Sequence, residues 1–98
     1  MTLRWSTSAR ANYLDYLRYL RGVAPASAKR AASEVEAETA RIEKTPLMAR
    51  PSRWAGMREW SLSRWSKIIV LRVDPAEIVI VAFVDARRDL STFTPKDD

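Results

Sequence analysis

The segment Asp85-Ala86-Arg87-Arg88-Asp89 carries charged side chains directly after the apolar run from Ile78 to Val84. The guanidinium groups of Arg87 and Arg88 donate hydrogen bonds in a planar fork, which fits the oxygens of carboxylates and phosphates. A carboxylate such as that of Asp85 could accept a proton if it were suitably placed. We therefore expect the function of the chain to lie at this edge, where a buried strand ends in charge.

The chain contains no cysteine and no histidine. This composition excludes disulfides, zinc sites made of Cys and His, and catalysis by a thiol or an imidazole. Acid–base chemistry would have to come from carboxylates, tyrosines, lysines or arginines. We expect the protein to use no cofactor and no metal ion.

Positive charge is in excess, with 17 Lys and Arg against 12 Asp and Glu and a formal net charge of +5. Most of these cations are arginines, which favours an acidic partner or nucleic acid, although an ordinary basic surface has the same composition. No stretch is long and apolar enough to span a membrane, and the N-terminus lacks the apolar segment of a signal peptide. We expect a cytoplasmic protein with no membrane partner.

The charged residues should lie at the end of a β-hairpin that runs from Lys67 to Leu90. Two apolar runs, residues 68–71 and 78–84, are separated by the turn sequence Asp74-Pro75-Ala76-Glu77. β-branched runs divided by a short Asp-Pro turn predict two antiparallel strands. Because both runs are nearly continuous rather than alternating, we expect both faces of the hairpin to be covered.

Two helices and two further strands should surround this hairpin. Apolar residues at helical spacing predict helices over residues 8–21 and 25–44, and the two-residue loop between them makes the helices antiparallel. Tyr13 and Tyr16 should face the core rather than form a platform for stacked bases. Alternating patterns predict strands over residues 2–6 and 57–64.

The predicted order β-α-α-β-β-β corresponds to an α+β fold, a two-layer sandwich in which a helical hairpin packs on an antiparallel sheet. We expect one domain over residues 1–98, with a polar, frayed tail at residues 91–98. The loop of residues 47–56 interleaves Arg50 and Arg53 with Trp54. This loop either contacts nucleic acid or covers the end of the sheet, and the sequence leaves both readings open.

In their order, spacing and total length, these segments resemble the RelE/ParE superfamily of bacterial toxins, and most of all its ParE branch. The resemblance covers nearly the whole chain and is carried by the opening strand that runs into Thr7-Ser8-Ala9, the helical hairpin that ends in Pro46, Gly56-Met57-Arg58-Glu59, Leu71-Arg72-Val73-Asp74 and Val84-Asp85-Ala86-Arg87-Arg88-Asp89. It implies a toxin that is silenced in a hetero-oligomer by its cognate antitoxin, a small acidic protein with a DNA-binding part.

The superfamily includes two activities. ParE-like members block DNA gyrase and thereby replication, and RelE-like members cleave messenger RNA on the ribosome. Asp85 stands where many relatives have a histidine, Lys67 lies near the position of a common aromatic residue, and Leu71 replaces a frequent tyrosine. Attack by a ribose 2′-hydroxyl needs a base, an acid and a cation, so the missing histidine argues against RNA cleavage.

The leading hypothesis is therefore a non-enzymatic, ParE-like gyrase inhibitor. The alternative is a RelE-like, ribosome-dependent endoribonuclease in which Asp85 or Lys67 transfers protons, and a weaker one is a degenerate toxin that only binds its antitoxin. For the target we expect a basic face that is formed by Arg58, Arg64, Lys67, Arg72, Arg87 and Arg88. Arg72 could instead face inward and pair with Asp89 or Glu59.

Overall fold

The centre of the fold is the antiparallel hairpin of β4 (Lys67–Val73) and β5 (Glu77–Asp85). The computed structural model describes residues 1–98, and every residue from Ile78 to Val84 is buried in it. The turn between the strands is held by Asp74, whose carboxylate accepts hydrogen bonds from two backbone N–H groups of the turn. The predicted hairpin is thereby confirmed.

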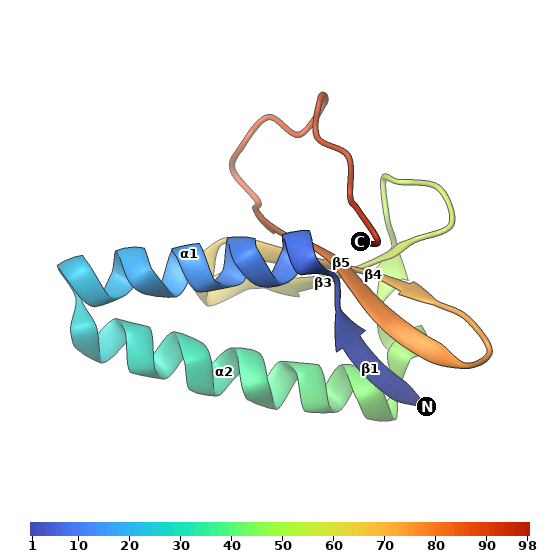
Figure 1. Cartoon of the computed structure of the whole chain (residues 1–98), viewed down its shortest axis with the longest axis horizontal. Coiled ribbons are helices and arrows are strands. Elements are labelled where there is room, and N and C mark those ends of the chain that lie inside the picture. Colours follow the sequence, from blue (N-terminus) through green and yellow to red (C-terminus); the bar gives the residue numbers. More distant parts are fainter.

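Five strands form one sheet in the order β1-β5-β4-β3-β2 (Figure 1). β3 (Arg58–Leu62) pairs antiparallel with β4, and the two-residue strand β2 (Arg50–Pro51) pairs antiparallel with β3. β1 (Thr2–Trp5) pairs parallel with β5 at the other edge. The sheet is therefore mostly rather than wholly antiparallel, and residues 47–56 include an edge strand that the sequence pattern did not predict.

Helices α1 (Thr7–Val23) and α2 (Pro25–Lys44) lie antiparallel on one face of the sheet (Figure 1). Ser6 caps α1, because its hydroxyl oxygen accepts a hydrogen bond from the Ala9 N–H. Ala24 alone separates the helices, which forces them into a tight hairpin. The α+β fold and the predicted order β-α-α-β-β-β are confirmed, with the two-residue β2 as an additional edge strand before β3. Neither helix combines the length and the apolar character needed to cross a membrane.

Apolar side chains from both layers fill the space between the helices and the sheet. Ile69 and Leu71 of β4 and Ile80 of β5 belong to this cluster together with Val35 and Ile42 of α2. Partly buried residues close its rim, among them Leu3, Trp5, Tyr13, Tyr16, Trp60 and Trp65. Two tyrosines of α1 thus face the core, as the sequence predicts.

Trp60 packs against this core but is half-buried. β3 has only the two-residue strand β2 beyond it, so the outer side of Trp60 stays open to solvent. Its indole Nε1 donates a hydrogen bond to the Glu38 carboxylate at 3.1 Å, and the guanidinium of Arg41 lies 5.7 Å from the ring centroid. The side chain therefore joins the sheet to α2 at the edge of the core rather than within it.

The second face of the sheet is covered by two segments without regular structure. Trp54, Met57 and Phe93 pack against buried residues of β4 and β5, and the Trp54 indole donates a hydrogen bond to the Phe93 carbonyl oxygen at 3.1 Å. Leu90 is buried in the same cluster. Trp54 thus covers the sheet, which is one of the two roles left open for its loop.

Residues 91–98 lie over this second face instead of extending freely. Pro95 is buried, and the Lys96 N–H donates a hydrogen bond to the Val81 carbonyl oxygen at 3.2 Å. The Asp97 carboxylate accepts hydrogen bonds from Arg4 and Arg72, and these contacts bring the two ends of the chain together. Apolar and acidic groups of the tail thus have partners across the sheet.

The contact between the two helices gives a stability prediction. Ala31 is fully buried where α2 faces Leu20 of α1. Ala31→Leu should lower the free energy of unfolding by about 1–3 kcal/mol, because the added atoms overpack the interface. Ala37→Leu is the matched control, since Ala37 is exposed on the same helix. Equal urea-denaturation midpoints for the two variants would contradict close helix packing at Ala31.

Candidate functional site

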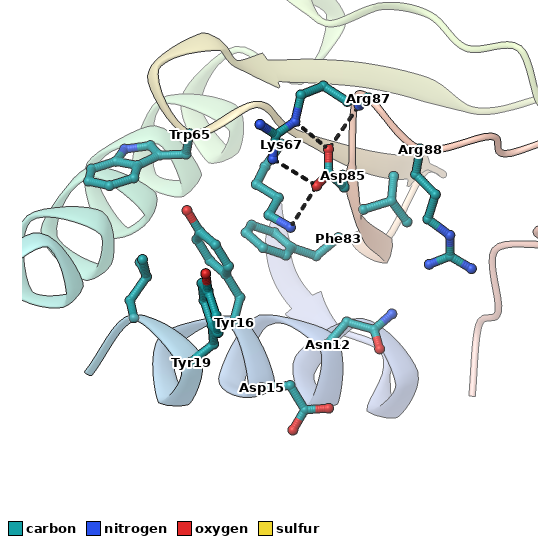
Figure 2. Close-up of a pocket in the computed structure, with 12 residues that line it drawn as sticks. Asn12, Asp15, Tyr16, Tyr19, Trp65, Lys67, Phe83, Asp85, Arg87 and Arg88 are labelled. Carbon is teal, nitrogen blue, oxygen red and sulfur yellow. Dashed lines mark hydrogen bonds and ion pairs between the residues drawn. The ribbon is translucent and has the colours of Figure 1, made fainter. Parts of the chain in front are cut away.

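An open cleft of about 560 Å³ lies where the C-terminal end of β5 meets α1 (Figure 2). We call it the α1–β5 cleft. The start of β4 contributes Lys67, the exit of β5 contributes Asp85, Arg87 and Arg88, and α1 contributes Tyr16 and Tyr19 among other residues. The cleft therefore contains the charged segment that directly follows the longest buried strand.

Lys67 is the central cation of the cleft. It lies directly opposite Asp85 in the β4–β5 register, and its Nζ is 3.9 Å from Asp85 Oδ2. The same Nζ lies 4.3 Å from the ring centroid of Tyr16 and 5.9 Å from that of Phe83, which are cation–π distances. Burial lowers the pKa of the Lys67 ammonium, and this effect outweighs the opposite influence of Asp85.

Asp85 is held as a carboxylate by its neighbours. It accepts a hydrogen bond from the Arg87 backbone N–H at 2.8 Å and two more from the Arg87 guanidinium at 3.2 and 3.1 Å. These contacts lower the pKa of Asp85 to about 2. A carboxylate this acidic is a weak base at neutral pH, so its position favours holding the cations in place over accepting protons.

Aromatic residues give the cleft its apolar wall. Burial raises the pKa of the Tyr16 phenol, which packs against the helix-side core. Tyr19 is 64% exposed at the rim. On the other side, Trp65 donates its indole N–H to the Glu34 carboxylate of α2. Rings and cations thus line one open surface, a composition that suits contact with another molecule.

The six predicted basic residues do not form one face. Lys67, Arg87 and Arg88 line the α1–β5 cleft, and Arg88 makes no ion pair. Arg64 lies apart and pairs with Glu34 at 3.3 Å. Half of the predicted set is therefore gathered at one site.

The other two arginines have structural partners. The Arg58 guanidinium donates to the Ala49 carbonyl oxygen at 2.9 Å and thereby fixes the segment after α2. Arg72 pairs with Asp74 and with Asp97 of the tail, and not with Asp89 or Glu59. Arg72 occupies the far end of β4 from Lys67, so it cannot share the cleft.

A second group of charges was not among the predicted site residues. Glu59 is only 3% exposed, yet its carboxylate accepts hydrogen bonds from Arg50, Ser52 and Arg53. Burial by itself would raise the pKa of Glu59, but the hydrogen bonds and charge of Arg53 and the Ser52 hydroxyl lower it overall. The arginines of the loop were the signal in the sequence that could have indicated this cluster. Glu59 could not be predicted as their partner, because the pairing of β2 with β3 brings it to them.

The ion pairs of Asp85 give a pH prediction. Its folded-state pKa is depressed to about 2, so its contribution to stability is complete above the ordinary value near 3.8 and is lost as pH falls towards 2. Asp85→Asn should cost about 0.5–1 kcal/mol at pH 7 and flatten the loss of stability below pH 4. The measurement is urea denaturation at several pH values. Asp15→Asn is the control, because Asp15 is exposed on α1. If it changed the pH dependence of the free energy of unfolding by the same amount, the contacts of Asp85 would not be the cause of that dependence.

Comparison with known proteins places the chain in a family. The model of the ParE toxins of type II toxin–antitoxin systems, parDE, matches residues 3–90. A solved chain described as the chromosomal ParDE TA system from P. aeruginosa has a similar fold, with a TM-score of 0.80 and 23% identity over 89% of this chain and 97% of that one. No curated protein sequence matches. Because the family match spans most of the chain, this protein belongs to the ParE toxin family of type II toxin–antitoxin systems.

Proposed function

We propose that this toxin inhibits DNA gyrase by binding through the α1–β5 cleft, without catalysing a reaction. The observation that supports this most directly is the state of Asp85, the group that could have served as a base. It is bound to Arg87, lies beside Lys67 and has a pKa of about 2. Inhibition by binding needs no proton transfer, and this arrangement is suited to it.

The groups left available in the cleft are suited to recognising an acidic surface. The Arg87 side chain is 75% exposed although it pairs with Asp85, and Arg88 has no carboxylate partner. Tyr19 adds an exposed ring. Arginines and tyrosines are the residue types that dominate the binding energy of protein interfaces, because they combine apolar area with directed hydrogen bonds.

A supercoiling assay with purified gyrase tests the proposal. The wild-type toxin should inhibit supercoiling, and Arg88→Ala should raise the inhibitory concentration by roughly 10-fold, as expected for the loss of one arginine contact that contributes strongly to binding. Arg30→Ala is the control, because Arg30 is an exposed arginine of α2 that does not line the cleft. Supercoiling that proceeds normally in excess wild-type toxin would refute gyrase as the target.

One observation favours RNA cleavage as a second candidate function. Lys67 has a lowered pKa, and an ammonium of lowered pKa is a better proton donor to a leaving group. If the toxin is a ribosome-dependent endoribonuclease, primer extension after induction should reveal discrete cuts in messenger RNA. Lys67→Arg should abolish them, since arginine keeps the charge but not the titratable proton, whereas exposed-site Lys29→Arg should not. Induction without growth arrest would indicate a degenerate toxin.

We further propose that a cognate antitoxin neutralises the toxin by pairing acidic residues with the cleft. Charge complementarity of this kind mainly accelerates encounter. Arg87→Gln combined with Arg88→Gln should therefore slow association and flatten its dependence on salt, with a smaller change in dissociation. Stopped-flow measurements against the purified antitoxin provide both rates. The pair Arg21→Gln and Arg30→Gln carries the same change in charge outside the cleft, and an equal effect there would exclude a role specific to the cleft.

A further inference from the structure

A second recess lies on the sheet face opposite the helices, beside the exit of β5. It has a volume of about 300 Å³ and is lined by residues of β2, β3 and the turn that leads into β4. Its polar lining consists of Arg50, Arg53, Lys67, Arg87, Ser61, Ser63 and Ser66. We call it the serine–arginine recess. Apart from Lys67 and Arg87, none of its residues belongs to the α1–β5 cleft.

Positive charge remains in the recess after its ion pairs are counted. Three arginines line it, and two carboxylates pair with them: Glu59 with Arg50 and Arg53, and Asp85 with Arg87. Lys67 also belongs to the lining, but its Nζ lies against the Tyr16 ring in the α1–β5 cleft. One positive charge is therefore uncompensated among the arginines of the recess. Glu59 accepts four hydrogen bonds, and those from Arg50 and Arg53 orient both guanidinium groups. Because Glu59 is buried, its negative charge is hardly exposed at the surface of the recess.

The arginines keep free donors in this arrangement. Arg53 binds Glu59 through Nε, and its guanidinium lies 5.4 Å from the ring centroid of Trp54, so its terminal N–H groups remain available. Arg50 uses only one terminal nitrogen on Glu59 and its side chain is 64% exposed. A planar cation that is fixed at one edge and free at the other is preorganised for an anion with several oxygens.

Three hydroxyl groups complete the lining. The side chains of Ser61, Ser63 and Ser66 make no hydrogen bond within the protein, although Ser66 sits in a tight turn with φ of 53°. The turn is fixed by the Ser66 N–H, which donates to the Ser63 carbonyl oxygen, and by the Ala86 N–H, which donates to the Ser66 carbonyl oxygen. Serine hydroxyls and arginines together are the side chains that contact the phosphates of nucleic acids.

The recess continues into a neighbouring one. A further recess of about 480 Å³ shares Arg53 with it and adds Arg88 and the edge of Trp54. This neighbouring recess also contains the Asp89 carboxylate, so its arginines are partly offset by negative charge. Because Arg53 lines both recesses, a chain of linked phosphates that crossed Arg53 would meet an arginine in each of them.

We propose that the serine–arginine recess binds a phosphate group of a nucleic-acid backbone. This role goes beyond gyrase inhibition, and it can be tested with gyrase absent. The contact would depend on charge and geometry rather than on base sequence, because the lining of the recess contains no aromatic side chain on which a base could stack. Arg50 and Arg53 would bind the phosphate oxygens, and the Ser61 and Ser63 hydroxyls would donate to them.

Fluorescence anisotropy with labelled single-stranded oligonucleotides of matched DNA and RNA sequence tests the proposal at low salt. Wild-type toxin should bind, and the logarithm of its binding constant should fall linearly with the logarithm of salt concentration, with a slope of about −0.7 for each phosphate that the protein neutralises. DNA and RNA binding equally would indicate that the phosphates alone are recognised, and tighter RNA binding would add a contact to the 2′-hydroxyl. Failure to bind either oligonucleotide would overturn the proposal.

Ser61→Asp is the decisive variant, because it places a second carboxylate in the recess beside Arg50 and Arg53 while Glu59 itself is retained. It should weaken binding about 10-fold or more through repulsion of the phosphate. Ser33→Asp is the matched control: Ser33 is also an exposed serine without a hydrogen bond, so the two variants have the same net charge. Equal weakening by both would show that only the overall charge matters and would overturn the site.

A second variant distinguishes loss of binding from loss of the folded structure. Arg53→Lys keeps a cation beside Glu59 but removes the planar fork, so binding should weaken several-fold while the melting temperature stays close to that of the wild type. Unchanged binding would argue against Arg53 as a ligand. An acidic peptide, polyglutamate, serves as competitor. If it bound as tightly as the oligonucleotides and lost affinity equally in Ser61→Asp, the recess would recognise carboxylates and the proposal would fail.

Discussion

Strands β4 and β5 are apolar on both of their faces, and each face must be removed from water. Side chains alternate across a strand, so the even and odd residues of Ile68 to Leu71 enter two different clusters. The helical hairpin covers one face. The other is covered by Trp54, Leu90 and Phe93. These residues lie in segments without regular structure, and contact with the apolar sheet is what holds the segments there. Burial of this hairpin therefore dictates the path of nearly every other part of the chain.

The same constraint places the charges. A buried strand that ends in solvent must change from apolar to polar within one or two residues, and β5 does so at Asp85. The register of the hairpin then sets Lys67 opposite that carboxylate, at the boundary between core and water. Partial burial there lowers the pKa of the lysine while hydrogen bonds lower that of the aspartate. The electrostatics of the cleft thus follow from where the core stops.

Much of this could be predicted from the sequence, because the hairpin and the helices are specified by local periodicity. Lys67, Asp85, Arg87 and Arg88 were predictable as neighbours for the same reason, since the pairing of two strands across a short turn is nearly fixed. The remaining partners come from distant segments. Arg72 meets Asp97, and Arg58 meets the carbonyl oxygen of Ala49, through contacts that no local pattern encodes.

The edges of the sheet were the hardest to predict for a related reason. Two residues suffice for β2, and so short a strand has no periodicity of its own. Half-burial of Trp60 follows from that narrow edge. The tail has a polar composition, yet Pro95 and Asp97 find complementary groups on a surface that exists only once the sheet has formed. In each case the deciding contact belongs to the tertiary structure.

The parallel pairing of β1 with β5 has a consequence for the order of events during translation. Arg4 of β1 binds Glu77 of β5, a residue 73 positions further along the chain. At the usual rate of synthesis, about 4–15 seconds separate the two residues on the ribosome. Throughout that interval Leu3 and Trp5 have no strand to join, while the helical hairpin can already form from local contacts. The nascent toxin therefore carries an unpaired first strand until its last strand has been made, and closure of the sheet is a late, non-local step.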